Sequence, residues 1–154
     1  MGLLAVPILA LTFPSAAASG IAAYNAVVFD PTTHGNVKLP AGTPEYKFCG
    51  IADINGVVVQ NNTEIGVGDY VLIGLTTGLS DGSAVINPGD FLALSGATSG
   101  SLLSQAIGAP TTPGTQANWT TRAFVGQCMN RAQVPATAGS YVDVLMRPFV
   151  AVCA

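Results

Sequence analysis

The stretch VGDYVLIGLTTGLSDGSAVINPGDFLALSG, residues 67–96, decides the fold class of this chain. Two runs of aromatic and aliphatic residues, 70–75 and 91–94, have the length of short strands, and the turn-forming sequence LSDGS lies between them. Each run follows a Gly-Asp pair, at Asp69 and at Asp90. A carboxylate at a turn accepts hydrogen bonds from nearby backbone N–H groups, so we predict that both aspartates are turn residues.

The same alternation of apolar runs and turns continues on both sides of this stretch. No long window shows a sustained period of 3.6 residues, so the sequence predicts an all-β chain. A short helix or a strand fits residues 101–108 about equally well. The further strands are predicted in IAAYNAVVFD (21–30), EYKFCGIADI (45–54), RAFVGQCMN (122–130) and SYVDVLMRPFVAV (140–152).

Several small residues predict the backbone between and within these strands. Asn55-Gly56 is a strong hairpin signal, and Gly35 and Asn36 are expected to adopt positive φ in the turn PTTHGN. Gly50 and Gly126 each follow an aromatic residue by two positions, and we expect them to mark bulges or close backbone approaches.

The chain carries few charges for its size. Of its 154 residues 49% are hydrophobic and only 8% are charged, against roughly 25% charged in an average soluble domain. With so little charge, we expect partners to cover much of the apolar surface. The five basic and eight acidic residues are scattered, so no basic patch is present and direct nucleic-acid binding is not expected.

Residues 1–29 contain no charged residue, and three interpretations of this segment remain open. A secretory signal lacks its basic start, and Pro7 and Pro14 interrupt both a signal and a membrane-spanning helix. The segment could simply pack on the chain's own core. The favoured interpretation is an extended apolar arm, residues 1–19, that lies on a neighbouring subunit or partner, followed by a β domain over 20–154.

The sequence contains no recognisable catalytic or metal-binding set. His34 is the only histidine and lies in a turn, with no strained nucleophile motif elsewhere in the chain. Cys49, Cys128 and Cys153 have apolar neighbours and no C-x-x-C spacing, so we expect buried thiols rather than a disulfide or a metal site. Glycine-rich nucleotide-binding motifs are absent. We therefore expect no enzyme activity and no cofactor.

Subunit contacts are expected from the apolar arm and from arginine, which is enriched at protein interfaces. For the arginines, ordinary surface ion pairing is the competing explanation. The predicted contact residues are Leu3, Leu4, Ile8, Leu9, Leu11, Phe13, Arg122 and Arg147.

The body of the chain, roughly residues 20–148, resembles the head-decoration proteins of tailed bacteriophages, also called capsid-stabilising or cement proteins. The resemblance rests on the order and spacing of four segments. They are YKFCGIADI, VGDYVLIGLTTGLSDGS, PGDFLALSG, and the closing pair AFVGQCMNRA and GSYVDVLMRP. The apolar N-terminal arm and the loop 109–119 depart from that family.

This resemblance implies a small β-barrel or β-sandwich that sits as a homotrimer on the outer surface of a virion and links neighbouring major capsid proteins. Assembly in the host cytoplasm and no membrane contact are implied as well. The family has no catalytic residues to transfer. The alternative is a secreted pilus, fibre or surface-layer subunit that uses its N-terminus as a signal.

Overall fold

The computed structural model describes residues 6–15, 20–41, 48–53, 66–105 and 120–153, with the backbone alone described for 6–8, 120–123 and 149–153. These residues form nine strands and no helix, which confirms the all-β prediction. The strands are β1 (Val6–Pro14), β2 (Ala26–Phe29), β3 (Val37–Lys38), β4 (Phe48–Ala52), β5 (Val67–Leu79), β6 (Phe91–Leu94), β7 (Leu102–Ser104), β8 (Thr120–Cys128) and β9 (Tyr141–Cys153).

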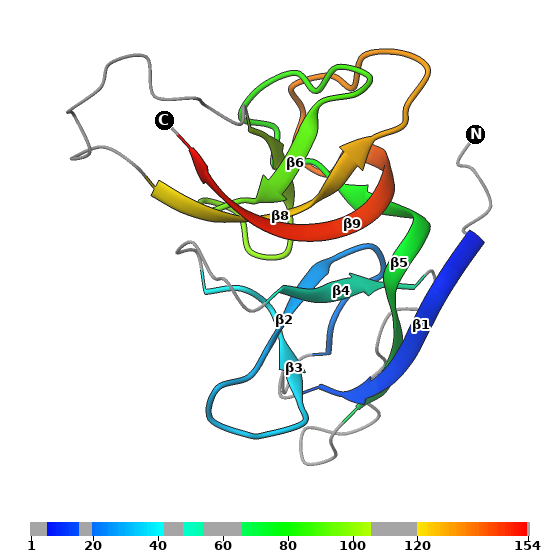
Figure 1. Cartoon of the computed structure of the whole chain (residues 1–154), viewed down its shortest axis with the longest axis vertical. Coiled ribbons are helices and arrows are strands. Elements are labelled where there is room, and N and C mark those ends of the chain that lie inside the picture. Colours follow the sequence, from blue (N-terminus) through cyan, green and yellow to red (C-terminus); the bar gives the residue numbers. More distant parts are fainter. Residues whose placement is uncertain (1–5, 16–19, 42–47, 54–65, 106–119, 154) are drawn as a thin grey trace.

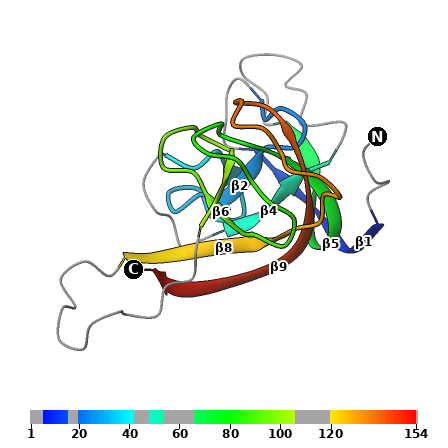
Figure 2. The ribbon, with the colours of Figure 1, turned by 90° about the horizontal axis from the view of Figure 1, so that it is seen from above.

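All nine strands belong to one antiparallel sheet with the order β3-β2-β4-β5-β9-β8-β6-β7, and β1 pairs with β5 outside this path. The sheet curls into a half-barrel, with β6, β8 and β9 above β2, β3 and β4 in Figure 1. This architecture agrees with the predicted small β-barrel. Figure 2 shows the same curvature from above, where β8 and β9 form one long paired ribbon.

Strand β5 connects the two halves of the sheet, which are β3-β2-β4 on one side and β9-β8-β6-β7 on the other. Its first half pairs with β1 and β4, and its second half pairs with β9. Gly74 lies where the pairing changes, because it is opposite both Pro7 and Met146. The φ of Gly74 is 122°, a conformation that side chains disfavour, so glycine allows β5 to bend at this point.

Two isolated bridges bring distant strands together and sustain the curl. Ser15, directly after β1, bridges to Val37 of β3. Ser80, directly after β5, bridges to Leu102 of β7. The terminal strands of the sheet order, β3 and β7, are therefore each connected back to the strand system around β5, which leaves little free edge on them.

Strand β2 and part of β5 are buried on both faces of the sheet, which explains the apolar composition. Ala26 and Val28 of β2 pack in the main core against β6, β8 and β9. Val27 between them packs in a second core, which also contains Ile21, Val37, Cys49, Ala52 and Tyr70. Tyr70 and Val71 of β5 divide in the same way. Because neighbouring residues point to opposite faces of a strand, β2 and β5 need apolar residues at consecutive positions here.

The turn predictions have mixed outcomes. Asp90 is a turn residue as predicted, since its carboxylate accepts a hydrogen bond from the backbone N–H of Asn87 at 2.8 Å. The prediction for Asp69 is wrong, because this residue lies inside β5, which begins earlier than the aromatic residue suggests. Gly35 has φ +86°, as predicted, whereas Asn36 does not adopt positive φ. Asn55-Gly56 lies outside the described residues.

Residues 102–104 form strand β7, so the strand alternative holds for the described part of 101–108. Gly50 and Gly126 mark close backbone approaches, as predicted. A Cβ at Gly50 would lie 2.7 Å from the carbonyl oxygen of Val71, and one at Gly126 would lie 2.0 Å from that of Leu145. The β8–β9 register also shifts between Phe124 and Gly126, which is the expected bulge.

The described part of the apolar N-terminal segment is strand β1, which pairs with residues 67–75 of β5. Along that edge the segment lies against its own chain. The other edge pairs with no described strand over Val6–Pro14, and β3 reaches it at Ser15, through the bridge to Val37. A partner on that open edge, and a boundary between arm and domain at residue 19, stay predictions.

Candidate functional site

The predicted contact residues of the arm lie on β1 or before it. Leu9 and Leu11 are 40% and 44% exposed, which is unusual for leucine in a strand. Leu9 lies opposite Ile73 of β5, which is 41% exposed, so the two side chains extend the same apolar surface. Leu3 and Leu4 lie outside the described residues. Of Ile8, only the backbone is described.

Phe13 differs from the leucines because it anchors β1 to the second core. Its ring makes an edge-on contact with Phe29, with the centroids 5.4 Å apart, and a tilted contact with Tyr70 at 6.2 Å. Phe13 is half-buried as a result. Its side chain therefore stabilises the fold, while the exposed leucines of β1 contribute little to it.

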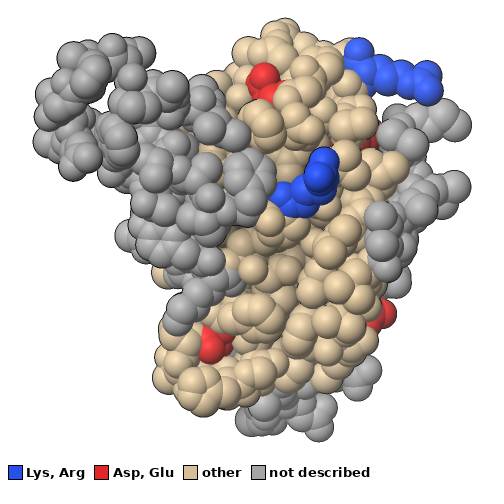
Figure 3. Space-filling view, in the orientation of Figure 1, with Lys and Arg blue, Asp and Glu red and all other residues tan. Residues whose placement is uncertain are grey.

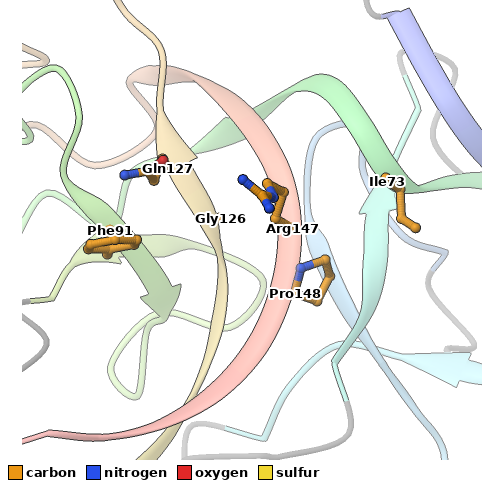
Figure 4. A pocket seen from close by; sticks show the side chains of 6 residues that line it. All are labelled: Ile73, Phe91, Gly126, Gln127, Arg147 and Pro148. Atoms are coloured by element: carbon orange, nitrogen blue, oxygen red, sulfur yellow. The ribbon is translucent and has the colours of Figure 1, made fainter.

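The two predicted arginines lie on neighbouring strands. Arg147 is exposed on β9 and lines a pocket of about 470 Å³, which Figure 4 shows from close by. Phe91 and Gln127 lie on one side of this pocket and Ile73 on the other, with Arg147 and Pro148 between them. The sixth lining residue is Gly126. Of Arg122, the backbone alone is described, and it lies opposite Ala151 of β9.

The pocket combines apolar walls with two polar side chains. The Gln127 amide points its Nε2 toward the carbonyl oxygen of Gly89, at 3.4 Å. Arg147 adds an exposed guanidinium, which pairs well with carboxylates. Sequence reasoning identified Arg147 and missed the other lining residues, because they come from four strands that are far apart in the sequence.

The carboxylates of Asp69, Asp81 and Asp90 accept hydrogen bonds that fasten the structure. The Asp81 carboxylate accepts from the backbone N–H of Ser83 at 2.9 Å and from the Ser95 hydroxyl at 2.7 Å. That of Asp90 accepts from the Ser104 hydroxyl at 2.8 Å, and that of Asp69 from the Thr12 hydroxyl. Carboxylates held in this way fasten turns and strands together, a role that needs no catalytic chemistry.

His34 and the described thiols lie apart from one another. His34 is exposed in the turn after β2. Cys49 and Cys128 are free and buried, as predicted, while the side chain of Cys153 is not described. Burial raises the pKa of the Cys49 thiol to about 12, so this thiol stays protonated at neutral pH. Within the described ranges, no group of three His, Cys, Asp or Glu side chains is placed to hold a metal ion.

Tyr70 carries the one unsatisfied buried side-chain oxygen or nitrogen of the described residues. Its side chain is fully buried in the second core, and its hydroxyl has no hydrogen-bond partner. Burial, and to a smaller degree Cys49, raises the pKa of this hydroxyl. An unpaired buried hydroxyl loses its hydrogen bonds to water on folding, so it destabilises the folded chain.

Replacing Tyr70→Phe is therefore expected to stabilise the protein, by about 1 kcal/mol. The substitution removes the unpaired hydroxyl and keeps the ring that contacts Phe13. Chemical denaturation of the two proteins measures the difference. Tyr141→Phe is the control, because Tyr141 is 63% exposed and the free energy of unfolding should hardly change. A loss of stability in Tyr70→Phe would show that the hydroxyl has a partner in solution.

Comparison of the chain with models of protein families, with curated proteins and with solved structures found no match. Among the described residues there is also no helix with the length and hydropathy needed to cross a membrane. A proposal for the function of this chain therefore rests on the geometry of the chain itself.

Proposed function

We propose that this chain is a viral structural protein, a head-decoration protein that binds the outer surface of a phage capsid as a trimer. In this role it stabilises the shell by bridging neighbouring major capsid proteins. The observation that carries the proposal is the exposed apolar surface of β1 and β5, at Leu9, Leu11 and Ile73, on a chain with very few charges. Such a surface is typical of a protein that is covered by a partner.

The charge distribution supports a structural role. Figure 3 shows one face of the molecule, on which a few Lys, Arg, Asp and Glu side chains are separated by wide neutral areas. A neutral surface suits contacts that depend on shape and apolar burial rather than on steering by charge. Contacts of this kind are individually weak, and repetition over a symmetric shell makes them strong together.

The β fold supports the same proposal. The end strands β3 and β7 of the curled sheet are bridged at Ser15 and Ser80, so few edges are free apart from that of β1, which suits a part that must resist outward pressure on a shell. The carboxylates of Asp81 and Asp90 are used within that frame, through hydrogen bonds from Ser95 and Ser104. The pocket beside Arg147 is then a second contact surface, on which a carboxylate of a shell protein could pair with the guanidinium.

The test is the composition and heat resistance of virus particles from cells that encode this chain. Mass spectrometry of purified particles should find the chain with an intact N-terminus, and particles that lack it should release DNA at a lower temperature. Absence of the chain from the particles would contradict the proposal. Secretion with loss of about 19 N-terminal residues would instead support a pilus, fibre or surface-layer subunit.

A further inference from the structure

Strand β1 has one open edge, and the hydrogen bonds at its end show which residues face it. Ser15 donates its N–H to the carbonyl oxygen of Gly66, at 2.7 Å, toward the β5 side. In an antiparallel pair, residues that face the partner strand alternate with residues that face away. Counting back from Ser15, the backbone groups of Phe13 and Leu11 face β5. Those of the residues between them face the open edge.

The residues that face outward are Ala10 and Thr12. Both are exposed, and no described strand pairs with this edge at Ala10 or Thr12. Directly beyond Pro14 the same edge is taken by β3, because Ser15 bridges to Val37. Each residue presents one N–H and one C=O in the plane of the sheet, so the edge offers two donors and two acceptors. Pro14 faces the same way by the same alternation, and its missing N–H removes no bond to β5.

This edge lacks charge, which is the feature that most directly prevents a strand from pairing with another chain. Natural edge strands are protected by lysine and other charges, by proline, by bulges, by very short length or by a covering loop. The nine residues Val6–Pro14 contain no charged side chain. Among the described residues, pairing is limited by Pro7 and Pro14 near the strand ends, by the register shifts on both sides of Leu9, and by β3 beside Ser15. The five residues from Leu9 to Phe13 are free of proline.

We propose that β1 pairs with β1 of a second copy of this chain, antiparallel, about a two-fold axis at Leu11. This register places Ala10 opposite Thr12 of the second copy and Thr12 opposite Ala10. Each of these pairs exchanges two backbone hydrogen bonds, so the contact contains four. The same arrangement joins β5-β1 of both copies into one continuous sheet.

The side chains are self-complementary in this register. Leu9, Leu11 and Phe13 share one face of β1, since residues two apart point the same way and the extra residue of the nearby bulge belongs to β5. Leu11 meets Leu11 of the second copy, and Leu9 meets Phe13. The two exposed leucines of each chain are therefore covered by apolar side chains.

A second copy fits this edge better than an unrelated segment for two reasons. A two-fold contact requires a patch that is complementary to itself, and an uncharged strand can lie opposite itself without like charges facing one another. This contact covers Leu9 and Leu11, on which the proposed function also rests, and it is tested separately because it predicts pairing of the purified chain in solution. If the chain also forms trimers, the two-fold contact links one trimer to the next.

The register gives a direct test by disulfide formation. Residues at a non-hydrogen-bonded pair have Cα atoms about 4.5 Å apart, which is within the range that a disulfide spans. Leu11→Cys is therefore expected to form a covalent dimer on mild oxidation, seen by non-reducing gel electrophoresis. Val85→Cys is the matched control, because Val85 is 42% exposed and lies in the loop between β5 and β6 rather than on β1. The wild-type protein, oxidised in the same way, measures any cross-linking through the native cysteines.

A second pair of variants tests the backbone and the side-chain contact separately. Ala10→Pro removes one outward N–H from each copy and no hydrogen bond to β5, so self-association in analytical ultracentrifugation should weaken about tenfold. Leu11→Lys places two lysines opposite each other and should abolish pairing, whereas Val85→Lys should not. Mixing Leu11→Lys with Leu11→Glu should restore association, because only a register centred on residue 11 brings the two charges together.

The results that overturn the proposal are equally specific. One is a Leu11→Cys protein that cross-links no faster than Val85→Cys. Another is a Leu11→Lys protein that associates like the wild type. If Ala10→Pro unfolds, the mixing experiment with the two charged variants decides, since failure to associate in the mixture rejects the register. Virus-particle composition has no bearing on any of these outcomes, so this inference and the proposed function fail independently.

Discussion

Gly126→Ala is expected to destabilise the chain by about 3 kcal/mol, which lowers the melting temperature by roughly 6–12 °C. A Cβ at this position would lie 2.0 Å from the carbonyl oxygen of Leu145 and 2.9 Å from its carbonyl carbon. These are backbone atoms of β9, so no side-chain rotation relieves the collision. Strand β8 would have to move away from β9, at the bulge where the two long strands change register. Thermal unfolding followed by circular dichroism measures the effect.

Gly78→Ala is the matched control for this prediction. Gly78 is also a buried strand glycine, and its Cβ would meet Cδ1 of Leu102 at 2.6 Å. That atom is the end of a side chain, which can shift, so the loss of stability should be clearly smaller than in Gly126→Ala. Equal losses in the two variants would mean that the β8–β9 approach is looser in solution than in the structure.

Leu102→Ala is expected to cost about 2–5 kcal/mol of stability, because it leaves a cavity in the main core. Leu102 is fully buried and belongs to the cluster that joins the two halves of the sheet. It also bridges to Ser80, and Asp81 donates its N–H to the Leu102 carbonyl oxygen at 2.9 Å. The backbone contact survives the substitution. The loss therefore measures side-chain packing, by urea denaturation of the two proteins.

Leu103→Ala is the control, since the neighbouring side chain is only half-buried and points to the opposite face of β7. Its truncation should cost about 1 kcal/mol or less. If the two substitutions lower the stability by the same amount, then β7 does not cover the main core in solution. The effect on the slope of unfolding against urea should also be small in both variants, because the area exposed on unfolding hardly changes.

The structure changes how the apolar N-terminal segment should be studied. Deleting residues 1–19 would remove β1, and with it the partner of β5 over residues 67–75. Such a deletion exposes a new edge in the middle of the fold and confuses folding with assembly. Substitutions at Leu11 and Ala10 leave β1 in place, so they separate the contact from the fold.

Much of the strand content follows from local patterns in the sequence. The aromatic and aliphatic runs in 70–75, 91–94, 122–130 and 140–152 are long enough and apolar enough to be strands, and the structure has strands over most of each run. Gly50 and Gly126 indicate bulges or close approaches, because a glycine inside a strand pattern often marks one of these features. These features depend on short-range chemistry and needed no knowledge of the fold.

The site was less predictable. Leu9, Leu11 and Arg147 were identified as contact residues from hydropathy and residue type, and the structure places their side chains at the surface. The pocket around Arg147 was missed, as was the exposed Ile73 beside Leu9. Both depend on which strands become neighbours, and apolar residues in a strand give no local sign of whether they will be covered.

The sequence by itself determined that this chain is all-β and poor in charge, and that its most apolar segment lies at its N-terminus, because composition and periodicity express these properties locally. Only the tertiary structure decided that β1 pairs with β5, that Asp69 lies within a strand and that the two faces of β2 are both buried. Strand pairing joins residues some 60 positions apart in the chain through backbone groups that every residue carries. Side-chain identity therefore does not determine which strand becomes the partner. The packing of the whole sheet determines it.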